Sequence, residues 1–226
     1  MRRITVALLS ALALAGPAHR DPAEVIPWAW ERREDLRFLG EGHSVAYYAG
    51  ILTLAGNRVI VEPRRNPLFL AGNTHRIAVI RIETRRPALD ARQREETLTA
   101  IRRLFREAEE LQIDFDATRS ERAFYRDLLV ALRARIDVPL SITALASWCT
   151  GDRWLADLPI DDAVPMLFRM GRDAPAIPLA FPEPRCRGSA GISLDEPLAS
   201  IPHARRVFVF NPDPWTETAW TNASLP

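Results

Sequence analysis

Short apolar runs with β character alternate with amphipathic stretches along most of the chain. This alternation is typical of parallel strands joined by crossover helices. Residues 75–83 are mostly apolar at both odd and even positions, as expected of a strand buried on two faces. The β-like runs cover residues 25–30, 44–54, 58–61, 75–83, 111–116, 140–147, 162–170, 191–194 and 206–210.

Two stretches have the 3.6-residue apolar period of helices that cover a sheet. The first spans residues 90–110, and the second follows Ser120, which we expect to be its N-cap. Shorter helical segments are expected at residues 35–39 and, in a degenerate form, at 197–201. The apolar stripes comprise Leu98, Ile101, Leu104, Phe105 and Ala108 in the first helix, and Phe124, Leu128, Leu132 and Ile136 in the second.

The order of about eight β elements and intervening helices predicts one α/β domain with a (β/α)8 TIM-like barrel fold and right-handed crossovers. The last third is less regular, because Pro165 lies inside a β-like run and residues 172–188 contain four prolines. Proline cannot donate a ladder hydrogen bond. The barrel can therefore be irregular or incomplete in this part.

The beginning of the chain predicts an export signal. Met1-Arg2-Arg3 is positively charged, residues 4–15 are almost entirely apolar, and Gly16-Pro17-Ala18 supplies small residues and a turn. We expect residues 1–18 to be a cleavable signal peptide and residues 19–226 to be the mature domain; a buried N-terminal helix is the alternative. The apolar run is shorter than the roughly 20 residues that span a bilayer. Pro17 stands where a lipidated cysteine would be, so we expect a periplasmic or secreted protein with no stable membrane anchor.

Charge and cysteine usage narrow the function classes. All 30 basic residues are Arg, and the chain also has 29 acidic residues, so it lacks the excess of positive charge that is typical of proteins that bind nucleic acid. The absence of Lys excludes lysine nucleophiles and Schiff bases. The two cysteines, Cys149 and Cys186, are expected to form a disulfide in an oxidising compartment. A catalytic thiol is the alternative, but no His lies near either cysteine in sequence.

Two carboxylates at a predicted strand end are the sharpest chemical signal. In residues 111–116, Asp114 and Asp116 are spaced i and i+2, which places them on one face roughly 7 Å apart, with Phe115 on the other face. Two acids in one partly dry pocket repel, so one of them holds its proton near neutral pH. A protonated acid beside an ionised one is what glycosidic cleavage uses. Such pairs also bind metals or cap helices.

Other candidates lie at the ends of further predicted strands, where TIM barrels assemble their active sites. Tryptophan faces are platforms for sugar rings, although any single Trp can equally be core packing. Tyr47 and Tyr48 are adjacent, so only one can face inward; we assign Tyr47 to the site. The predicted substrate-binding residues are Trp30, Tyr47, Glu83, Trp148, Arg169, Asn211 and Trp215.

Metal and cofactor sites are not expected. The four histidines are scattered without ligand spacing, and Glu83 with the Asp114–Asp116 pair is the one plausible carboxylate cluster. The chain has no Gly-rich phosphate loop and no Gly-x-Ser-x-Gly elbow. We therefore predict no cofactor.

Four ordered motifs carry a resemblance to a bacterial family described as domain of unknown function 3142. The likeness spans most of the mature chain and implies a fold and a compartment more than a reaction. The motifs are Val25-Ile26-Pro27-Trp28-Ala29-Trp30-Glu31-Arg32, residues 111–117, Leu140-Ser141-Ile142-Thr143-Ala144-Leu145 with Trp148, and Val164-Pro165-Met166-Leu167-Phe168-Arg169-Met170-Gly171.

The chain is more distantly similar to chitinase-like glycoside hydrolases, which are (β/α) barrels. Their fourth strand ends in Asp-x-Asp-x-Glu, and this resemblance implies that Asp116 is the general acid and Asp114 its supporting carboxylate. The first Asp of the motif falls at Gln112, the acid is Asp instead of Glu, and the region of Arg169 lacks the expected Tyr-Asp. The resemblance therefore favours glycan binding more than catalysis.

Together these observations predict an exported carbohydrate-active barrel. Its partner would be a polysaccharide or oligosaccharide of the cell envelope or surroundings, whose glycosidic bond is cleaved by carboxylate acid/base chemistry. Two alternatives stay open. One is a non-catalytic glycan-binding barrel, and the other is a structural exported protein whose acids cap a helix.

Overall fold

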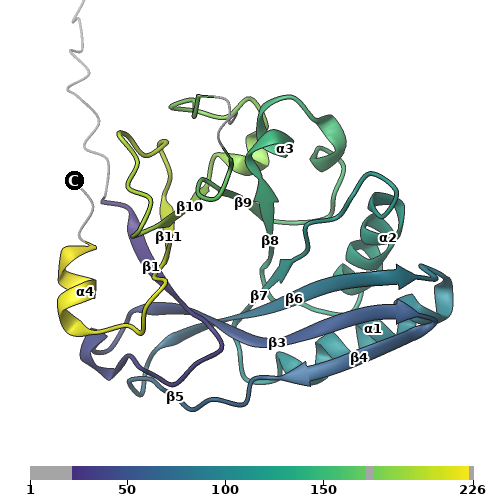
Figure 1. Ribbon diagram of the computed structural model, residues 1–226, viewed down its shortest axis with the longest axis horizontal. Coiled ribbons are helices and arrows are strands. Elements are labelled where there is room, and N and C mark those ends of the chain that lie inside the picture. Colours follow the sequence, from purple (N-terminus) through teal and green to yellow (C-terminus); the bar gives the residue numbers. More distant parts are fainter. Residues whose placement is uncertain (1–21, 172–175, 224–226) are drawn as a thin grey trace, which may run out of the picture.

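Eight parallel strands close into a barrel in the computed structural model, which describes residues 22–171 and 176–223 (Figure 1). The ring is closed where β1 pairs with β3, through Trp28 opposite Ala46 and Ala29 opposite Tyr47. The predicted TIM-like barrel is thus confirmed, and all eight strands are present. In ring order they are β1 (Glu24–Ala29), β3 (Ser44–Gly56), β6 (His75–Pro87), β7 (Glu110–Asp114), β8 (Leu140–Leu145), β9 (Asp162–Met166), β10 (Ser189–Ser193) and β11 (Arg206–Phe210).

Side chains alternate between the inside and the outside of the barrel, because successive residues of a strand face opposite ways. The inner core is small and continuous; it contains Ile26, Trp28, Ala46, Ile77, Val79, Val164 and Phe208. The outer faces of the strands contribute to two further cores, one beneath the helices that follow β6 and β7 and one beside the segment that follows β11.

The two longest helices cover one side of the barrel. Helix α1 (Ala91–Leu104) follows β6, and its N-cap Asp90 accepts a hydrogen bond from the backbone N–H of Gln93 at 2.7 Å. Helix α2 (Arg122–Arg133) follows β7. Its N-cap is Glu121 and not the expected Ser120, because the Glu121 carboxylate itself accepts the backbone N–H and the hydroxyl of Thr118 and closes the preceding turn.

Strands β3 and β6 are long and extend beyond the barrel (Figure 1). The outer half of β3 pairs antiparallel with β4 (Arg58–Pro63), so the predicted β run at residues 58–61 is a hairpin on β3 and not a barrel strand. Gly56 makes the turn with φ of 54°. Val59 of β4 packs against the hydrophobic core that also contains residues of α1.

Short elements fill the first two connections. Residues 34–39 form β2 (Glu34–Asp35) and one turn of 3-10 helix, η1 (Arg37–Leu39), instead of a helical link alone. Strand β2 pairs with β5 (Leu68–Phe69) in a small separate sheet. Helix α4 (Glu217–Asn222) packs on the outside of the barrel near β1 (Figure 1).

The last third keeps its strands but has little helix. Strand β8 ends at Leu145 and continues directly into α3 (Ala146–Thr150), which is followed by η2 (Arg153–Leu155); β9 ends at Met166, earlier than expected. In the described part of the segment between β9 and β10, the one helical turn is η3 (Pro184–Cys186). The degenerate helix expected at residues 197–201 does not form, because Pro202 disfavours helical backbone in the residue before it.

A disulfide ties this irregular part together. Cys149 in α3 is bonded to Cys186 in η3, with Cα atoms 5.8 Å apart, which confirms the predicted pair. The signal peptide expected at residues 1–18 lies outside the described residues. Within residues 22–171 and 176–223, no helix has both the length and the apolar character needed to cross a membrane.

Candidate functional site

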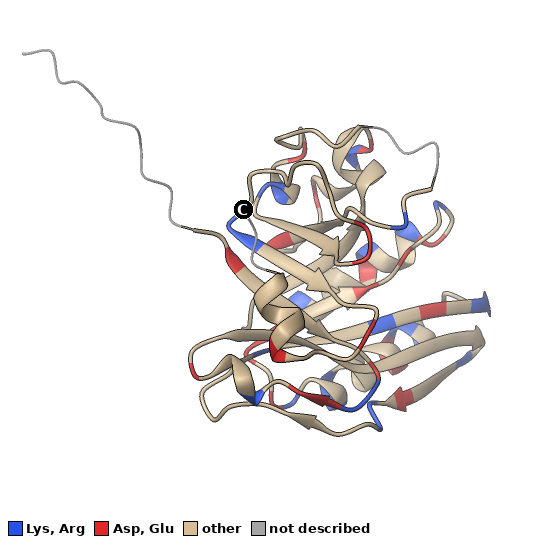
Figure 2. Cartoon of the chain, turned by 60° about the vertical axis from the view of Figure 1, so that its left-hand side comes forward, with Lys and Arg blue, Asp and Glu red and all other residues tan. Residues whose placement is uncertain are grey.

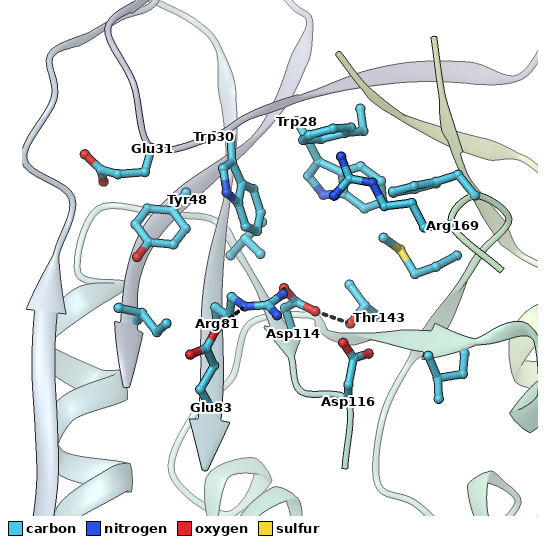
Figure 3. Close-up of a pocket in the computed structure, with 16 residues that line it drawn as sticks. Trp28, Trp30, Glu31, Tyr48, Arg81, Glu83, Asp114, Asp116, Thr143 and Arg169 are labelled. Atoms are coloured by element: carbon cyan, nitrogen blue, oxygen red, sulfur yellow. Dashed lines mark hydrogen bonds and ion pairs between the residues drawn. The ribbon is translucent and has the colours of Figure 1, made fainter. Parts of the chain in front are cut away.

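A cavity of about 580 Å³ opens at the carboxyl ends of the barrel strands (Figure 3). Seven of the eight barrel strands, or the residues directly after them, contribute to its wall. This is the end of the fold at which TIM barrels assemble their sites. The lining residues are Trp28, Trp30, Glu31, Tyr48, Ile51, Val79, Arg81, Glu83, Asp114, Asp116, Thr143, Leu145, Met166, Phe168, Arg169 and Phe210.

Asp114 is buried and rigidly held at the last position of β7. Its Oδ2 accepts Nη1 of Arg81 at 2.9 Å, and its Oδ1 accepts the hydroxyl of Thr143 at 2.8 Å (Figure 3). Arg81 also donates from Nε to Glu83 at 3.1 Å. The neighbouring strands β6 and β8 thus fix the orientation of this carboxylate.

Asp116 lies two residues further on and faces the same cavity (Figure 3). Phe115 between them faces outward and packs against Tyr125 of α2 at 5.0 Å, as the alternation predicts. Among the described residues, the Asp116 carboxylate has neither a hydrogen-bond donor nor an ion-pair partner. Asp116 is exposed at the cavity mouth, and its partial desolvation there raises the pKa of its carboxyl group. The nearby charge of Asp114 raises this pKa further, against a smaller opposing effect of Arg81.

Aromatic rings form the wall opposite the carboxylates (Figure 3). Trp30 lies 5.2 Å from Tyr48 and 6.3 Å from Phe210, measured between ring centroids. Phe210 stacks on Phe168 at 5.7 Å with the planes nearly parallel. Flat apolar surfaces beside polar groups are suited to bind the two faces of a sugar ring.

The floor of the cavity is closed by the Trp28 indole, which is 3% exposed. Its Nε1 donates to the side-chain oxygen of Gln112 at 2.9 Å across the barrel, and Gln112 donates to Ser141 at 3.3 Å. The ring also lies over Gly191, where a Cβ atom would come within 2.8 Å of it. Gln112, which replaces the first Asp of the chitinase-like motif, therefore has a neutral partner in a fully buried place.

Trp30, Glu83, Asp114, Asp116 and Arg169, all expected in the site, line this one cavity. Tyr47 does not: its ring packs into the outer cores, and Tyr48 faces the cavity instead. Burial raises the pKa of the Tyr48 hydroxyl to about 12, so it stays protonated.

Trp148 is buried outside the cavity, contrary to the expectation that it lines a sugar subsite. Because β8 ends at Leu145, Trp148 lies on α3, which turns away from the mouth. Its ring meets Trp154 edge-on at 4.9 Å and is covered by the guanidinium of Arg122 at 5.7 Å. The residue is part of the outer core and borders a second hollow beyond Leu145.

Asn211 and Trp215 also lie outside the cavity lining. The Asn211 side chain accepts the backbone N–H of Asp213 at 3.2 Å and so shapes the loop after β11. Trp215 is 4% exposed; its Nε1 donates to the backbone oxygen of Trp28 at 2.9 Å, and its ring packs against Trp220 of α4. Both residues act in packing, because the chain after β11 turns back along the outside of the barrel.

Several lining residues were not predicted, although the alternation pointed to some of them. Arg81 follows Ile77 and Val79 at a spacing of two, so it shares their inward face. Thr143 bonds to Asp114, yet its position carries no chemical signal in the sequence. Glu31 was noted only as the residue after Trp30; its carboxylate accepts the side chain and backbone of Asn66, and these bonds keep its pKa low despite partial burial.

Within residues 22–171 and 176–223, no group of three His, Cys, Asp or Glu side chains is arranged to hold a metal ion. Acidic and basic residues are interspersed over the fold (Figure 2). A scan of family models finds no match for this chain, and neither curated proteins nor solved structures contain a match. The inference of function therefore depends on the geometry of the cavity.

Proposed function

We propose that this protein is a carbohydrate-active barrel that binds a saccharide in the cavity and hydrolyses a glycosidic bond with Asp116 as proton donor. One observation carries the proposal. Asp116, which has no hydrogen-bonded or ion-paired partner among the described residues, has a raised pKa and faces an open cavity beside a carboxylate that is held in place by Arg81 and Thr143. Two acids whose surroundings differ in this way suit the two roles of glycosidic cleavage.

The proposed reaction uses the difference between the two carboxyl groups. Asp116 transfers its proton to the glycosidic oxygen as the bond between that oxygen and the anomeric carbon breaks. Asp114 stabilises the positive charge that develops on the sugar ring. Water then adds hydroxide to the anomeric carbon, and its remaining proton restores Asp116.

The aromatic wall supports the saccharide as substrate class. Trp30, Tyr48, Phe168 and Phe210 offer ring faces on the side of the cavity opposite the acids. This wall does not depend on Asp116, and it also favours a second candidate, a glycan-binding barrel without catalysis. The variant Asp116→Asn distinguishes the two candidates, because only catalysis requires the Asp116 proton.

We further propose a periplasmic or secreted location. The Cys149–Cys186 disulfide supports an oxidising compartment, and the signal-like residues 1–18 support export. Resemblance to the domain of unknown function 3142 family stays a prediction, as does the more distant likeness to chitinase-like barrels, which would also make Asp116 the acid.

The test is a screen of the mature protein against cell-wall glycans and bacterial exopolysaccharides, with new reducing ends as the readout. Wild type is compared with Asp116→Asn and with the control Asp137→Asn, an exposed aspartate before β8 at the other end of the barrel. We expect product from wild type and Asp137→Asn, and a loss of roughly 10²–10⁴-fold in Asp116→Asn. Equal product from all three proteins would refute catalysis by Asp116. Binding without product from any protein would establish the glycan-binding candidate.

A further inference from the structure

Arg169 is held over the cavity by its backbone and by an aromatic shelf (Figure 3). Its φ of 54° is in the left-handed region, which residues other than glycine rarely adopt. Its backbone N–H donates to Glu196 Oε2 at 2.8 Å. The guanidinium lies over the ring of Phe210 at 5.3 Å, and that ring stacks on Phe168. Strained backbone that is secured in this way is a feature of ligand-binding positions.

The Arg169 guanidinium forms no ion pair with any of the described residues. Arg81, the other arginine of the cavity, is bound to Asp114 and Glu83. In contrast, no carboxylate or other acceptor among the described residues bonds to the Arg169 guanidinium. Stacking on Phe210 occupies one face of the group and leaves its in-plane N–H donors for a ligand. A planar guanidinium binds a carboxylate through two parallel hydrogen bonds.

A second hollow begins on the other side of Leu145, which lines both spaces and is 40% exposed. We call it the outer hollow. Its one acid, Asp152, is paired with Arg122 at 2.6 Å, whereas Arg119 and Arg153 have no acidic partner among the described residues. The outer hollow is lined by Ala117, Thr118, Arg119, Arg122, Leu145, Ser147, Trp148, Gly151, Asp152 and Arg153.

We propose that the saccharide is acidic: Arg169 binds the carboxylate of a uronic acid unit in the cavity, and the chain continues over Leu145 into the outer hollow. This inference rests on the proposed function in that it takes the cavity to be a saccharide site. A neutral glycan would leave Arg169, Arg119 and Arg153 without a partner. Among the described cavity residues, Glu83 and Asp114 share Arg81, Glu31 is hydrogen-bonded to Asn66, and Asp116 is the acid proposed to hold a proton. Arg169 is therefore the cavity cation that has no carboxylate paired with it.

The first experiment compares D-glucuronate with D-glucose, which differ only in the group at C6. Binding is followed by the fluorescence of the cavity tryptophans in wild type, in Arg169→Gln and in Arg106→Gln, an exposed arginine after α1 that serves as the control. We expect wild type and Arg106→Gln to bind glucuronate about tenfold more tightly than glucose, and Arg169→Gln to lose this preference without change in glucose binding. Arg169→Lys should keep part of it, because it retains the charge but not the planar fork.

D-Glucose 6-sulfate distinguishes a carboxylate at C6 from another anion, since its charged oxygens lie further from the sugar ring than those of a C6 carboxylate. We expect it to bind more weakly than glucuronate. Equal affinity for glucose and glucuronate, a preference that survives in Arg169→Gln, or no saturable binding of either sugar would overturn the carboxylate subsite.

The second experiment tests the path of the chain with hexagalacturonate. The double variant Arg119→Gln/Arg153→Gln should bind this oligomer about tenfold more weakly than wild type does, and the loss should shrink in high salt. Its binding of glucuronate should be unchanged. An oligomer that binds no more tightly than the monosaccharide, or equally to wild type and double variant, would overturn the path through the outer hollow.

Asp116→Asn separates this inference from the proposed function. If wild type cleaves no glycan, the proposed catalysis is refuted. If Asp116→Asn then still binds glucuronate more tightly than glucose, the acidic subsite at Arg169 is supported independently of catalysis. If wild type cleaves neutral glycans and Arg169→Gln is as active, catalysis stands and the acidic substrate class is refuted.

Discussion

The two ends of the barrel each carry an aspartate with a raised pKa, but the surroundings of the two groups differ. At the carboxyl ends of the strands, Asp116 faces an open cavity and has no partner among the described residues. At the amino ends, burial raises the pKa of Asp162 to about 6, although the Ser189 hydroxyl donates a hydrogen bond to it. Desolvation is the main cause at both ends, so a raised pKa does not by itself identify a site.

The amino end is closed by paired side chains. Arg206 on β11 reaches across to Glu110 on β7 at 2.9 Å, and Glu110 also contacts His75 on β6 at 2.9 Å. The Ser44 hydroxyl donates to Glu24 at the start of β1. Apart from the buried Nε of Arg206, which has no hydrogen-bond partner in the described part of the chain, these polar groups pair with one another, whereas the described residues at the mouth leave a carboxyl group and a guanidinium for a ligand. This difference agrees with the division in TIM barrels between a stabilising face and a catalytic face.

The largest expected effect is on activity, when Asp116 and Asp162 are each replaced by Asn. Asp116→Asn should lower kcat/KM by roughly 10²–10⁴-fold, because the proton donor is removed, and should leave the melting temperature nearly unchanged. Asp162→Asn should leave activity unchanged and alter only stability. Activity assays and thermal unfolding of both variants check this crossed pattern; a loss of activity in Asp162→Asn would break the contrast between the two ends.

The disulfide joins α3, after the mouth end of β8, to η3, before the amino end of β10. Replacing both Cys149 and Cys186 by Ser should lower the free energy of unfolding by about 3 kcal/mol, since the unfolded chain gains conformational freedom. Neither sulfur lines the cavity, so activity at moderate temperature should be retained. Denaturant titration measures the change, and reduced wild type should match the double variant. Equal stability of the oxidised protein and the variant would contradict this expectation.

The ion network at the amino end should contribute to stability alone. Arg206→Met leaves Glu110, a largely buried carboxylate, without its guanidinium partner and should cost about 2 kcal/mol, less than a fully buried pair because both groups keep some exposure. Arg205→Met, at an exposed neighbouring position, is the matched control. Chemical denaturation of both variants measures the difference; similar losses in the two would show that the network is not the cause.

The smallest expected effect is on pH dependence. The pKa of Asp162 is raised from 3.8 to about 6 in the folded protein, so the folded state holds a proton that the unfolded chain releases. This contribution to stability is complete below about pH 4, falls as pH rises to about 6 and is then lost. Such a rise in pKa corresponds to about 3 kcal/mol, and because Asp162 is only partly buried we expect a span of about 1 kcal/mol. Unfolding measured across this window should show a steeper decline in wild type than in Asp162→Asn. Parallel curves would show that Asp162 does not titrate in this way.

Local patterns were sufficient for much of the architecture. The apolar runs located the barrel strands, since a strand buried on both faces must be apolar along its length. The spacing of Asp114 and Asp116 placed both on the inner face, with Phe115 outside. The elements of the last third are harder to predict, because prolines and short connections have no periodicity. The run of β4 has the same pattern as a barrel strand, so the sequence does not show that it forms a hairpin with β3.

The positions of the tryptophan side chains could not be predicted from the sequence. Trp30, Trp148 and Trp215 all follow predicted strand ends, yet only Trp30 lines the cavity. Whether a ring after a strand faces the mouth or the outer core depends on where the strand ends and which way the chain then turns.

The barrel strands, the paired aspartates and their common face can be predicted from the amino-acid sequence, because they follow from the two-residue repeat of a strand. The neighbours that surround these residues can be identified only in the folded barrel. Among the described residues, the Asp116 carboxyl group and the Arg169 guanidinium face the cavity without a hydrogen-bonded or ion-paired partner. Contacts between strands that are distant in the chain allow Arg81 and Thr143 to hold Asp114. Such contacts leave no local signal, since each depends on the register and closure of the whole barrel.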